Sequence, residues 1–236
     1  MPGVPVSADP AIPPSPKEQI VLAAERLFAA HGLDGVSLRQ IGAAAGNANN
    51  SAVQYHFGSK DQLVRAIFEH RLPHLHERRR LLVEARRPAD LRSWVECYVL
   101  PILEQGEQTG SHYLGFVAML QQSGHRGVFD RLPERFLDST RRFRDEVGAR
   151  LPHVPEPLRS HRIAQALAFS VHATADRERA RSLGHGVLPF AVHVSDLLDG
   201  LVGFLEAPVS AGALAALDDT DHDLTDPDRL AFPVLL

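Results

Sequence analysis

The sequence predicts an all-α protein, in which an N-terminal three-helix helix-turn-helix domain precedes a larger helical domain. Two features of the sequence lead to this prediction. Apolar residues recur with the three- and four-residue spacing of one helix face, and no segment alternates convincingly between apolar and polar residues as a strand does. The chain has 236 residues, 44% of them hydrophobic, which is enough for one large domain or for one small and one medium domain.

Two helices open the small domain. An apolar stripe predicts the first helix, which ends near Gly32. The members of this stripe are Ile20, Ala23, Ala24, Leu27 and Phe28. Ser37 and Gln40 form a capping box for the second helix, because the serine oxygen accepts the N–H three residues on and the glutamine reaches back. Gly46 supplies the left-handed residue that ends this helix.

A short third helix follows the polar turn. Val53 and Phe57 are its only strongly apolar pair, so the helix can be anchored to the first two through this pair alone. Gly58 ends it, and Ser59 with Gln62 is a second capping box that opens a fourth helix. The spacing is that of a helix-turn-helix.

The third helix leaves a run of polar and aromatic residues pointing outward. They are Asn49, Asn50, Ser51, Ala52, Gln54, Tyr55 and His56. Asparagine and glutamine pair with adenine edges, while serine, tyrosine and the helix N-terminus reach phosphates. Arg39 and Lys60 flank this surface and are expected to hold phosphates. This composition suits contact with double-stranded DNA.

The distribution of charge permits this interpretation although the net charge is −4. Residues 16–80 contain nine Lys and Arg and six Asp and Glu, so this segment is positive. Residues 1–15 are proline-rich and lack Lys and Arg, and we expect a disordered leader. Residues 207–236 contain six aspartates and one arginine, and we expect an acidic, loosely ordered tail.

The two strings "AAERLFAAHGLDGVSLRQIGAAAG" and "YHFGSKDQLV" have helix, capping box, glycines and an aromatic-His-Phe-x-x-Lys signature in one order. On these strings, residues 17–65 resemble the DNA-binding domain of the TetR family of transcriptional regulators. The chain has one residue more between Gly46 and Phe57 than the usual family pattern, and Gln54 stands where an aromatic is common. The resemblance implies a homodimer on a palindromic operator, acting as a repressor. It also implies release by a small, mainly apolar ligand.

The rest of the chain is expected to form the larger domain. The boundaries that we expect are residues 16–72 for the small domain and 73–206 for the large one. Pro73 lies inside the fourth helix or at its break, where a lost hydrogen bond would bend it. Apolar periodicity predicts five more helices, over residues 88–108, 111–123, 128–150, 158–183 and 188–206.

The last predicted helix is apolar on more than one face. Val194, Leu197, Leu201 and Leu205 form one stripe, and three further apolar residues lie beside it: Leu198, Val202 and Phe204. A surface helix needs only one stripe, so the second covers the core of the same chain or packs against another subunit. The resemblance favours the second subunit, because TetR regulators dimerise through their last two long helices.

The resemblance also places an effector pocket among the middle helices. The candidate lining residues are Trp94, Tyr98, Tyr113, Phe116, Met119, Phe169 and His172. Each of the large apolar ones has a competing interpretation as an ordinary core residue. The preponderance of rings among them predicts a mainly apolar, aromatic effector.

Other sites are not expected. Cys97 is the single cysteine and is expected to be buried. His70 and His74 have zinc-binding spacing, but no carboxylate and histidine complete a set, so neither a metal nor a cofactor is predicted. Three arginine clusters are interpreted as solvated helix faces: Arg78–Arg80, Arg141–Arg144 and Arg177–Arg181.

Two classes of function therefore compete. The favoured one is a dimeric regulator that binds DNA and responds to a ligand. The alternative is an all-helical enzyme or binding protein with the helix-turn-helix as scaffolding, but no convergent set of acid, base or nucleophile is present in the sequence. No apolar run approaches the roughly 20 residues of a membrane-spanning helix, and no signal peptide is recognisable, so we expect a cytoplasmic protein without a membrane partner.

Overall fold

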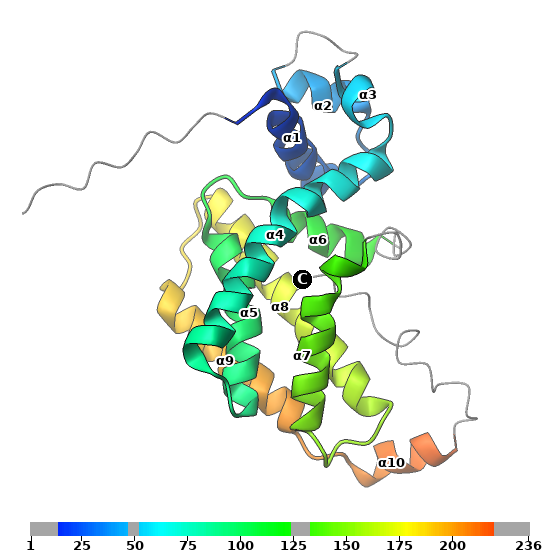
Figure 1. Cartoon of the computed structure of the whole chain (residues 1–236), viewed down its shortest axis with the longest axis vertical. Helices are drawn as coiled ribbons and strands as arrows, with labels where there is room; N and C mark the ends of the chain where they lie inside the picture. The colour runs from blue at the N-terminus through cyan, green and yellow to red at the C-terminus, as the bar shows by residue number, and fades with distance from the viewer. Residues whose placement is uncertain (1–13, 47–51, 124–132, 220–236) are drawn as a thin grey trace, which may run out of the picture.

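A computed structural model describes residues 14–46, 52–123 and 133–219, which are helical with no strand among them. A small bundle of helices lies at one end of the molecule, and a long helix leads from it into a larger bundle (Figure 1). The predicted fold class, a small helix-turn-helix domain followed by a larger helical domain, is confirmed. The helix positions predicted from the sequence differ from the structure in only a few places, described below.

Local capping rules account for the ends of the first helices. The small domain contains α1 (Pro16–His31), α2 (Leu38–Ala44), α3 (Ala52–Phe57) and the start of α4 (Lys60–Arg86). The capping box between Ser37 and Gln40 is present as predicted, with bonds of 2.8 and 3.3 Å. A second box, between Ser15 and Glu18, begins α1 and was not predicted. At the start of α4 the Ser59 hydroxyl accepts the Gln62 N–H, but the Ser59 N–H donates to the Phe57 carbonyl at 2.7 Å.

The larger domain is built from six further α-helices in the described part of the chain. They are α5 (Leu91–Glu107), α6 (Tyr113–Gln122), α7 (Asp138–Ala149), α8 (Leu158–Ser182), α9 (Phe190–Glu206) and α10 (Ala211–Asp218). Four of the five predicted helices agree with α5, α6, α8 and α9 to within a few residues.

Two segments differ from the prediction. The helix expected over residues 128–150 begins only at Asp138, after the 3-10 turn Glu134–Phe136, because Pro133 is extended at φ −57° and ψ 139°. Residues 128–132 lie outside the described residues. Residues 211–218, expected to be loosely ordered, form α10, where the Ser210 hydroxyl caps the helix by accepting the Ala213 N–H.

The fourth helix joins the two domains without a break. Pro73 lies inside α4, which contacts α1 of the small domain and α5 of the large one. The side chain of Pro73 is exposed, so the helix turn that lacks its N–H faces solvent. A single continuous helix therefore connects the end of α3 with the large domain.

One hydrophobic core runs through both domains. Helix α6 packs against α1 on one side and α8 on the other. The rings of Phe28, Phe68 and Phe116 meet there, with centroids 6.3 Å apart for Phe28 and Phe116 and 5.6 Å for Phe68 and Phe116. Because α1 contributes to this cluster, the small domain is packed on the large domain as well as tethered to it.

No single helix in the described part of the chain has the length and apolar composition to cross a membrane. Helices α9 and α10 meet the criterion only as a pair, and they are bent by 55° relative to each other.

Candidate nucleic-acid interface and ligand cavities

The close approach of α2 and α3 fixes the helix-turn-helix. A Cβ atom added to Gly42 would lie 3.3 Å from Cγ2 of Val53, so a glycine lets the two helices meet. Val53 is fully buried and Phe57 is 8% exposed. The predicted anchoring of α3 through this pair is therefore confirmed, and Gln54, Tyr55 and His56 face away from the core.

The described outward positions of α3 have the exposure that DNA contact requires. Gln54, Tyr55 and His56 are exposed, Tyr55 to 85%. The rings of Tyr55 and His56 lie 5.3 Å apart, which restricts both. The Gln54 amide donates to the Gly58 carbonyl at 2.9 Å, closing the C-terminal end of the helix. Gln54 is thus held at the surface in a fixed position.

The structure describes only some of the other residues that were predicted to contact DNA. Asn49, Asn50 and Ser51 lie outside the described residues. Ala52 is the first residue of α3. Arg39 is exposed on α2, where a phosphate is reachable.

Lys60 has a contact that the sequence did not predict. Its ammonium group donates to the Leu33 carbonyl at 2.7 Å and is partly buried. The residue thereby ties the start of α4 to the turn after α1, and an ammonium group has two further hydrogens for a phosphate. Lys17 was missed by sequence reasoning: it is exposed, and its ammonium group lies 5.8 Å from the Phe57 ring centroid at the end of α3. Its place in the first turn of α1 was the available signal.

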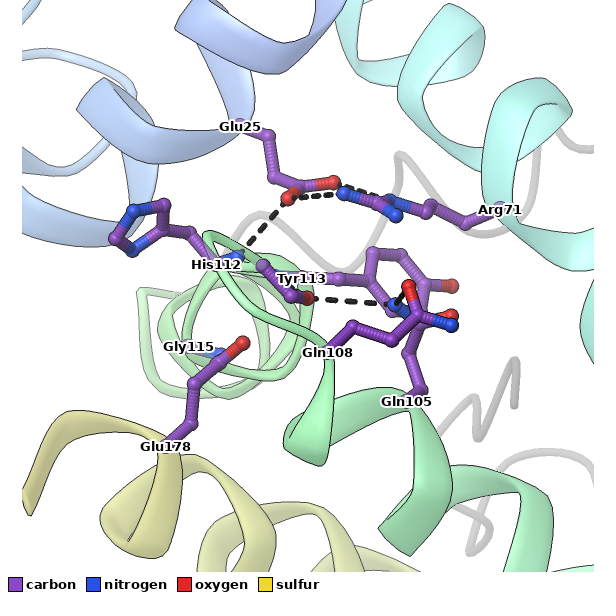
Figure 2. Close-up of polar contacts among 9 residues, drawn as sticks. Glu25, Arg71, Gln105, Gln108, His112, Tyr113, Gly115 and Glu178 are labelled. Carbon is purple, nitrogen blue, oxygen red and sulfur yellow. Dashed lines mark hydrogen bonds and ion pairs between the residues drawn. The ribbon is translucent and has the colours of Figure 1, made fainter. Parts of the chain in front are cut away.

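A buried carboxylate joins the small domain to the large one. Glu25 of α1 is 1% exposed and accepts two hydrogen bonds from the Arg71 guanidinium of α4, at 2.7 and 2.8 Å. The same carboxylate accepts the backbone N–H of His112, at the start of α6, at 3.0 Å. Figure 2 shows these three elements converging on Glu25. Three helices are thus fixed by one side chain.

A second buried carboxylate lies on the opposite side of α6 (Figure 2). Glu178 of α8 accepts the backbone N–H of Gly115 at 3.0 Å, and burial raises the pKa of this carboxyl to about 7. A Cβ atom added to Gly115 would lie 3.5 Å from the Cβ of Ala29 in α1. Helices α1, α6 and α8 therefore approach closely at this turn.

The seven predicted effector residues do not form one pocket. Tyr113 and Phe116 are fully buried in the common core, whereas Phe169 is 57% exposed on α8. The other four residues divide between two cavities. Trp94 and Tyr98 line one, and Met119 and His172 line the other.

The cavity beside Trp94 lies among α4, α5 and α7 and has a volume of about 230 Å³. Apolar and cationic side chains line it together: His76, Arg79, Arg80, Val83, Trp94, Cys97, Tyr98, Asp138, Ser139, Arg142 and Phe143. We call it the α4–α5–α7 cavity. Cys97 is buried here as predicted, and burial raises the pKa of its thiol.

The prediction that Arg78–Arg80 form a solvated cluster is wrong for Arg79, which is only 4% exposed. It follows Leu72 and Leu75 on the inward face of α4, and this spacing was a signal for burial. Its guanidinium carbon lies 3.5 Å from the Tyr98 ring centroid, and its Nε donates to the Tyr98 carbonyl at 3.2 Å. Burial lowers the pKa of Arg79 to about 10, so the group remains charged at neutral pH.

The second cavity, which we call the α1–α6–α8 cavity, measures about 640 Å³. Several of its lining residues are polar or charged: Arg26, His112, Gln122, Asp176, Glu178 and Arg179. It lies beside the Glu25 and Glu178 contacts rather than within the large domain. Its mixed charges offer no single preference for a ligand.

No group of three histidine, cysteine, aspartate or glutamate side chains in the described ranges is placed to hold a metal ion. His70 is half-buried on α4, and burial lowers its pKa.

Comparison with known proteins gave two family matches on separate parts of the chain. Residues 20–67 match the model described as bacterial regulatory proteins, tetR family. Residues 96–207 match the model described as tetracyclin repressor-like, C-terminal domain. The residues between the two matches include most of α4 and the start of α5, where the small domain passes into the large one. No curated protein matches the chain.

Among the solved structures that match, two cover about four-fifths of this chain. Native NalD from Pseudomonas aeruginosa, the secondary repressor of the MexAB-OprM multidrug efflux pump, is 22% identical with a TM-score of 0.50. The match covers 79% of this chain and 94% of that chain. The fatty acid degradation regulator FadR from Bacillus halodurans is 14% identical with a TM-score of 0.49, over 81% of this chain and 97% of that chain. At these identities the likeness concerns the fold.

Proposed function

The chain belongs to the TetR family of bacterial regulatory proteins and is a DNA-binding transcriptional regulator, and from this premise we propose that it is a homodimeric repressor released by a small-molecule effector. Its operator is a palindrome with one half-site for each small domain. The DNA partner places the protein in the cytoplasm. The exposed surface of α3, held by Val53 and Phe57 from below, is the single observation that supports this proposal most strongly.

DNA contact follows from the chemistry of that surface. Gln54 offers an amide to base edges, and Tyr55 and His56 offer ring and hydroxyl groups to the backbone. Lys17, beside Phe57 at the end of α3, and Arg39, exposed on α2, add positive charge to the small domain. Lys60 contributes both a tertiary hydrogen bond and a charge.

Dimerisation uses the outward faces of the last two long helices. On α9 the exposed face contains Val192, Gly200, Gly203 and Phe204, with Val192 50% and Phe204 41% exposed. The two glycines have open space where a Cβ would lie, and each costs a helix about 1 kcal/mol relative to alanine. Small residues on an exposed apolar helix face favour close approach of a second helix. On α8, Phe169 adds a further exposed ring.

The stripe of α9 that includes Leu201 covers the core of its own chain, which was the alternative to a subunit contact. Leu201 is 2% exposed and Leu198 is 3% exposed, so both pack against the chain's own core. A charge at Leu201 would therefore unfold the large domain. Phe204 is the better position for a test of the dimer interface.

Release of DNA requires the effector to favour one spacing of the two small domains. Helix α4 lines the α4–α5–α7 cavity and begins directly after α3. Glu25 and Arg71 fix α4 to α1 between these two points. A shift of α4 at the cavity is therefore transmitted to the DNA-binding surface.

Two experiments test the proposed function. Selection of bound sequences from random duplex DNA should yield a palindrome, and recovery of unrelated sequences alone would contradict operator recognition. Sedimentation should give a dimer at micromolar concentration for the parent chain and a monomer for Phe204→Asp. Leu81→Asp is the matched control, because Leu81 is 44% exposed on α4, outside the proposed interface. A dimeric Phe204→Asp would place the interface elsewhere.

A further inference from the structure

Among the described residues, the α4–α5–α7 cavity contains a buried cation, Arg79, and no buried counter-charge. Arg79 forms its hydrogen bonds with neutral groups, the Tyr98 carbonyl at 3.2 Å and the Ser139 hydroxyl at 3.4 Å. Asp138 also lines the cavity, but its side chain is 72% exposed and lies 3.7 Å from Arg141. An isolated buried charge is costly unless a partner of opposite sign compensates it.

Three residues around this cavity also have buried side-chain nitrogens that lack a partner in the described part of the chain. They are Nη2 of Arg79, Nε1 of Trp94 and Nε2 of His76. Buried polar atoms in proteins are rarely left in this state, so each requires an explanation. Burial lowers the pKa of His76 to about 4, which makes this ring neutral at physiological pH. The guanidinium and indole groups are donors only, and what they lack is an acceptor.

The charge and size of the cavity restrict that acceptor. Arg142 also lines the cavity, with its guanidinium carbon 5.5 Å from the Trp94 ring centroid, whereas Arg80 is engaged by Glu77 and Glu84. The surroundings of an acceptor are therefore cationic and aromatic. A cavity of roughly 150 Å³ holds benzene, so 230 Å³ takes one ring with a short substituent.

We propose that the α4–α5–α7 cavity binds a small aromatic carboxylate, whose anionic group is held by Arg79 and whose ring packs beside Trp94. This assignment names the chemical class of the effector and so rests on the proposed function. It refines the expectation of a mainly apolar ligand, since the ring is retained and a negative charge is added. The Nη2 group of Arg79 then donates to the carboxylate in a charge-assisted hydrogen bond.

The chain contains its own reporter for binding. Trp94 is the single tryptophan and lines the cavity, so its fluorescence should change when a ligand enters. The probes are benzoate and phenylacetate, each compared with its neutral amide, benzamide and phenylacetamide. The titrations use the full chain without DNA.

We expect each acid to bind roughly 10- to 100-fold more tightly than its amide, because a charge-assisted hydrogen bond is lost with the amide. Arg79→Met should abolish this preference by weakening the acids alone. Arg78→Met is the matched control, since Arg78 is an exposed neighbour paired with Glu104 and lies outside the cavity, and it should keep the preference. Circular dichroism of each variant checks that it is folded.

Several outcomes would overturn the assignment. They are equal binding of acid and amide by the parent chain, no binding of either acid at millimolar concentration, and an equal loss of acid and amide binding in Arg79→Met. The parent comparison needs no variant, so it decides the matter even if Arg79→Met does not fold. A chain that discriminates the acids but selects no DNA sequence would refute the proposed function alone.

Discussion

The buried pair between Glu25 and Arg71 should be worth several times more than an exposed pair of the same geometry. In Glu25→Gln the carboxylate that accepts two guanidinium hydrogens and the His112 N–H is replaced by a neutral amide. Arg71 is 11% exposed, so its charge remains largely buried without a partner. Breaking a buried pair in this way costs about 3–5 kcal/mol. Because Arg71 retains some contact with water, which partly hydrates the unpaired charge, we expect a cost near the lower value.

The chain offers an internal control for this prediction. Arg78 and Glu104 also form a two-bond pair, at 2.7 and 2.8 Å, and they also join α4 to another helix. Their side chains are 45% and 33% exposed, so Glu104→Gln should cost about 1 kcal/mol or less. The two pairs differ mainly in burial.

Urea unfolding followed by far-ultraviolet circular dichroism measures the loss of unfolding free energy in Glu25→Gln and in Glu104→Gln. Adding Arg71→Met to Glu25→Gln should recover part of the loss, because the unpaired charge is removed. Equal destabilisation by Glu25→Gln and Glu104→Gln would refute the reasoning that burial makes Glu25 a structural link. So would full additivity of the Glu25 and Arg71 substitutions.

Three further predictions concern other parts of the molecule. Phe116→Ala should lower the free energy of unfolding by about 3–5 kcal/mol, as measured in urea, because the ring is fully buried against Phe28 rather than in a cavity. The pKa of Glu178 is raised from 4.5 to about 7, so stability should fall as the pH rises through that interval; Glu178→Gln should remove this fall, which is at most about 3 kcal/mol, in unfolding curves at several pH values. Lys60→Met should cost about 1 kcal/mol of stability through the lost bond to Leu33, and it should weaken binding to all DNA sequences alike in salt titrations. A pH-independent parent, or a Lys60→Met variant that loses only operator binding, would contradict the corresponding reasoning.

Local rules made much of the fold predictable from sequence. The serine at the start of α2, the glycine after it and the spacing of Val53 and Phe57 each act within a few residues, so they are legible without knowledge of the rest of the chain. The late start of α7 was missed because the helical pattern continued through a position where Pro133 is extended. Apolar periodicity alone does not mark such a boundary.

The sites were harder to predict because they depend on how helices pack against one another. The aromatic residues of α5 and α6 look alike in sequence, yet Trp94 lines a cavity and Phe116 fills the core. Arg79 was predicted to be solvated because its two neighbours in sequence are also arginines. Its position on the inward face of α4 buries it instead. Glu25 was hidden in the same way, as a carboxylate on the apolar face of α1 whose partners are 46 and 87 residues away.

The ratio of affinities for the selected operator and for a scrambled duplex of equal length tests operator recognition most directly. Measured at about 150 mM salt, the parent chain should prefer the operator by roughly 10³-fold or more. Gln54→Ala should reduce this ratio by roughly 10-fold or more while leaving binding to the scrambled duplex unchanged. A ratio near one for the parent chain would contradict sequence recognition and favour a helix-turn-helix that serves only as scaffolding.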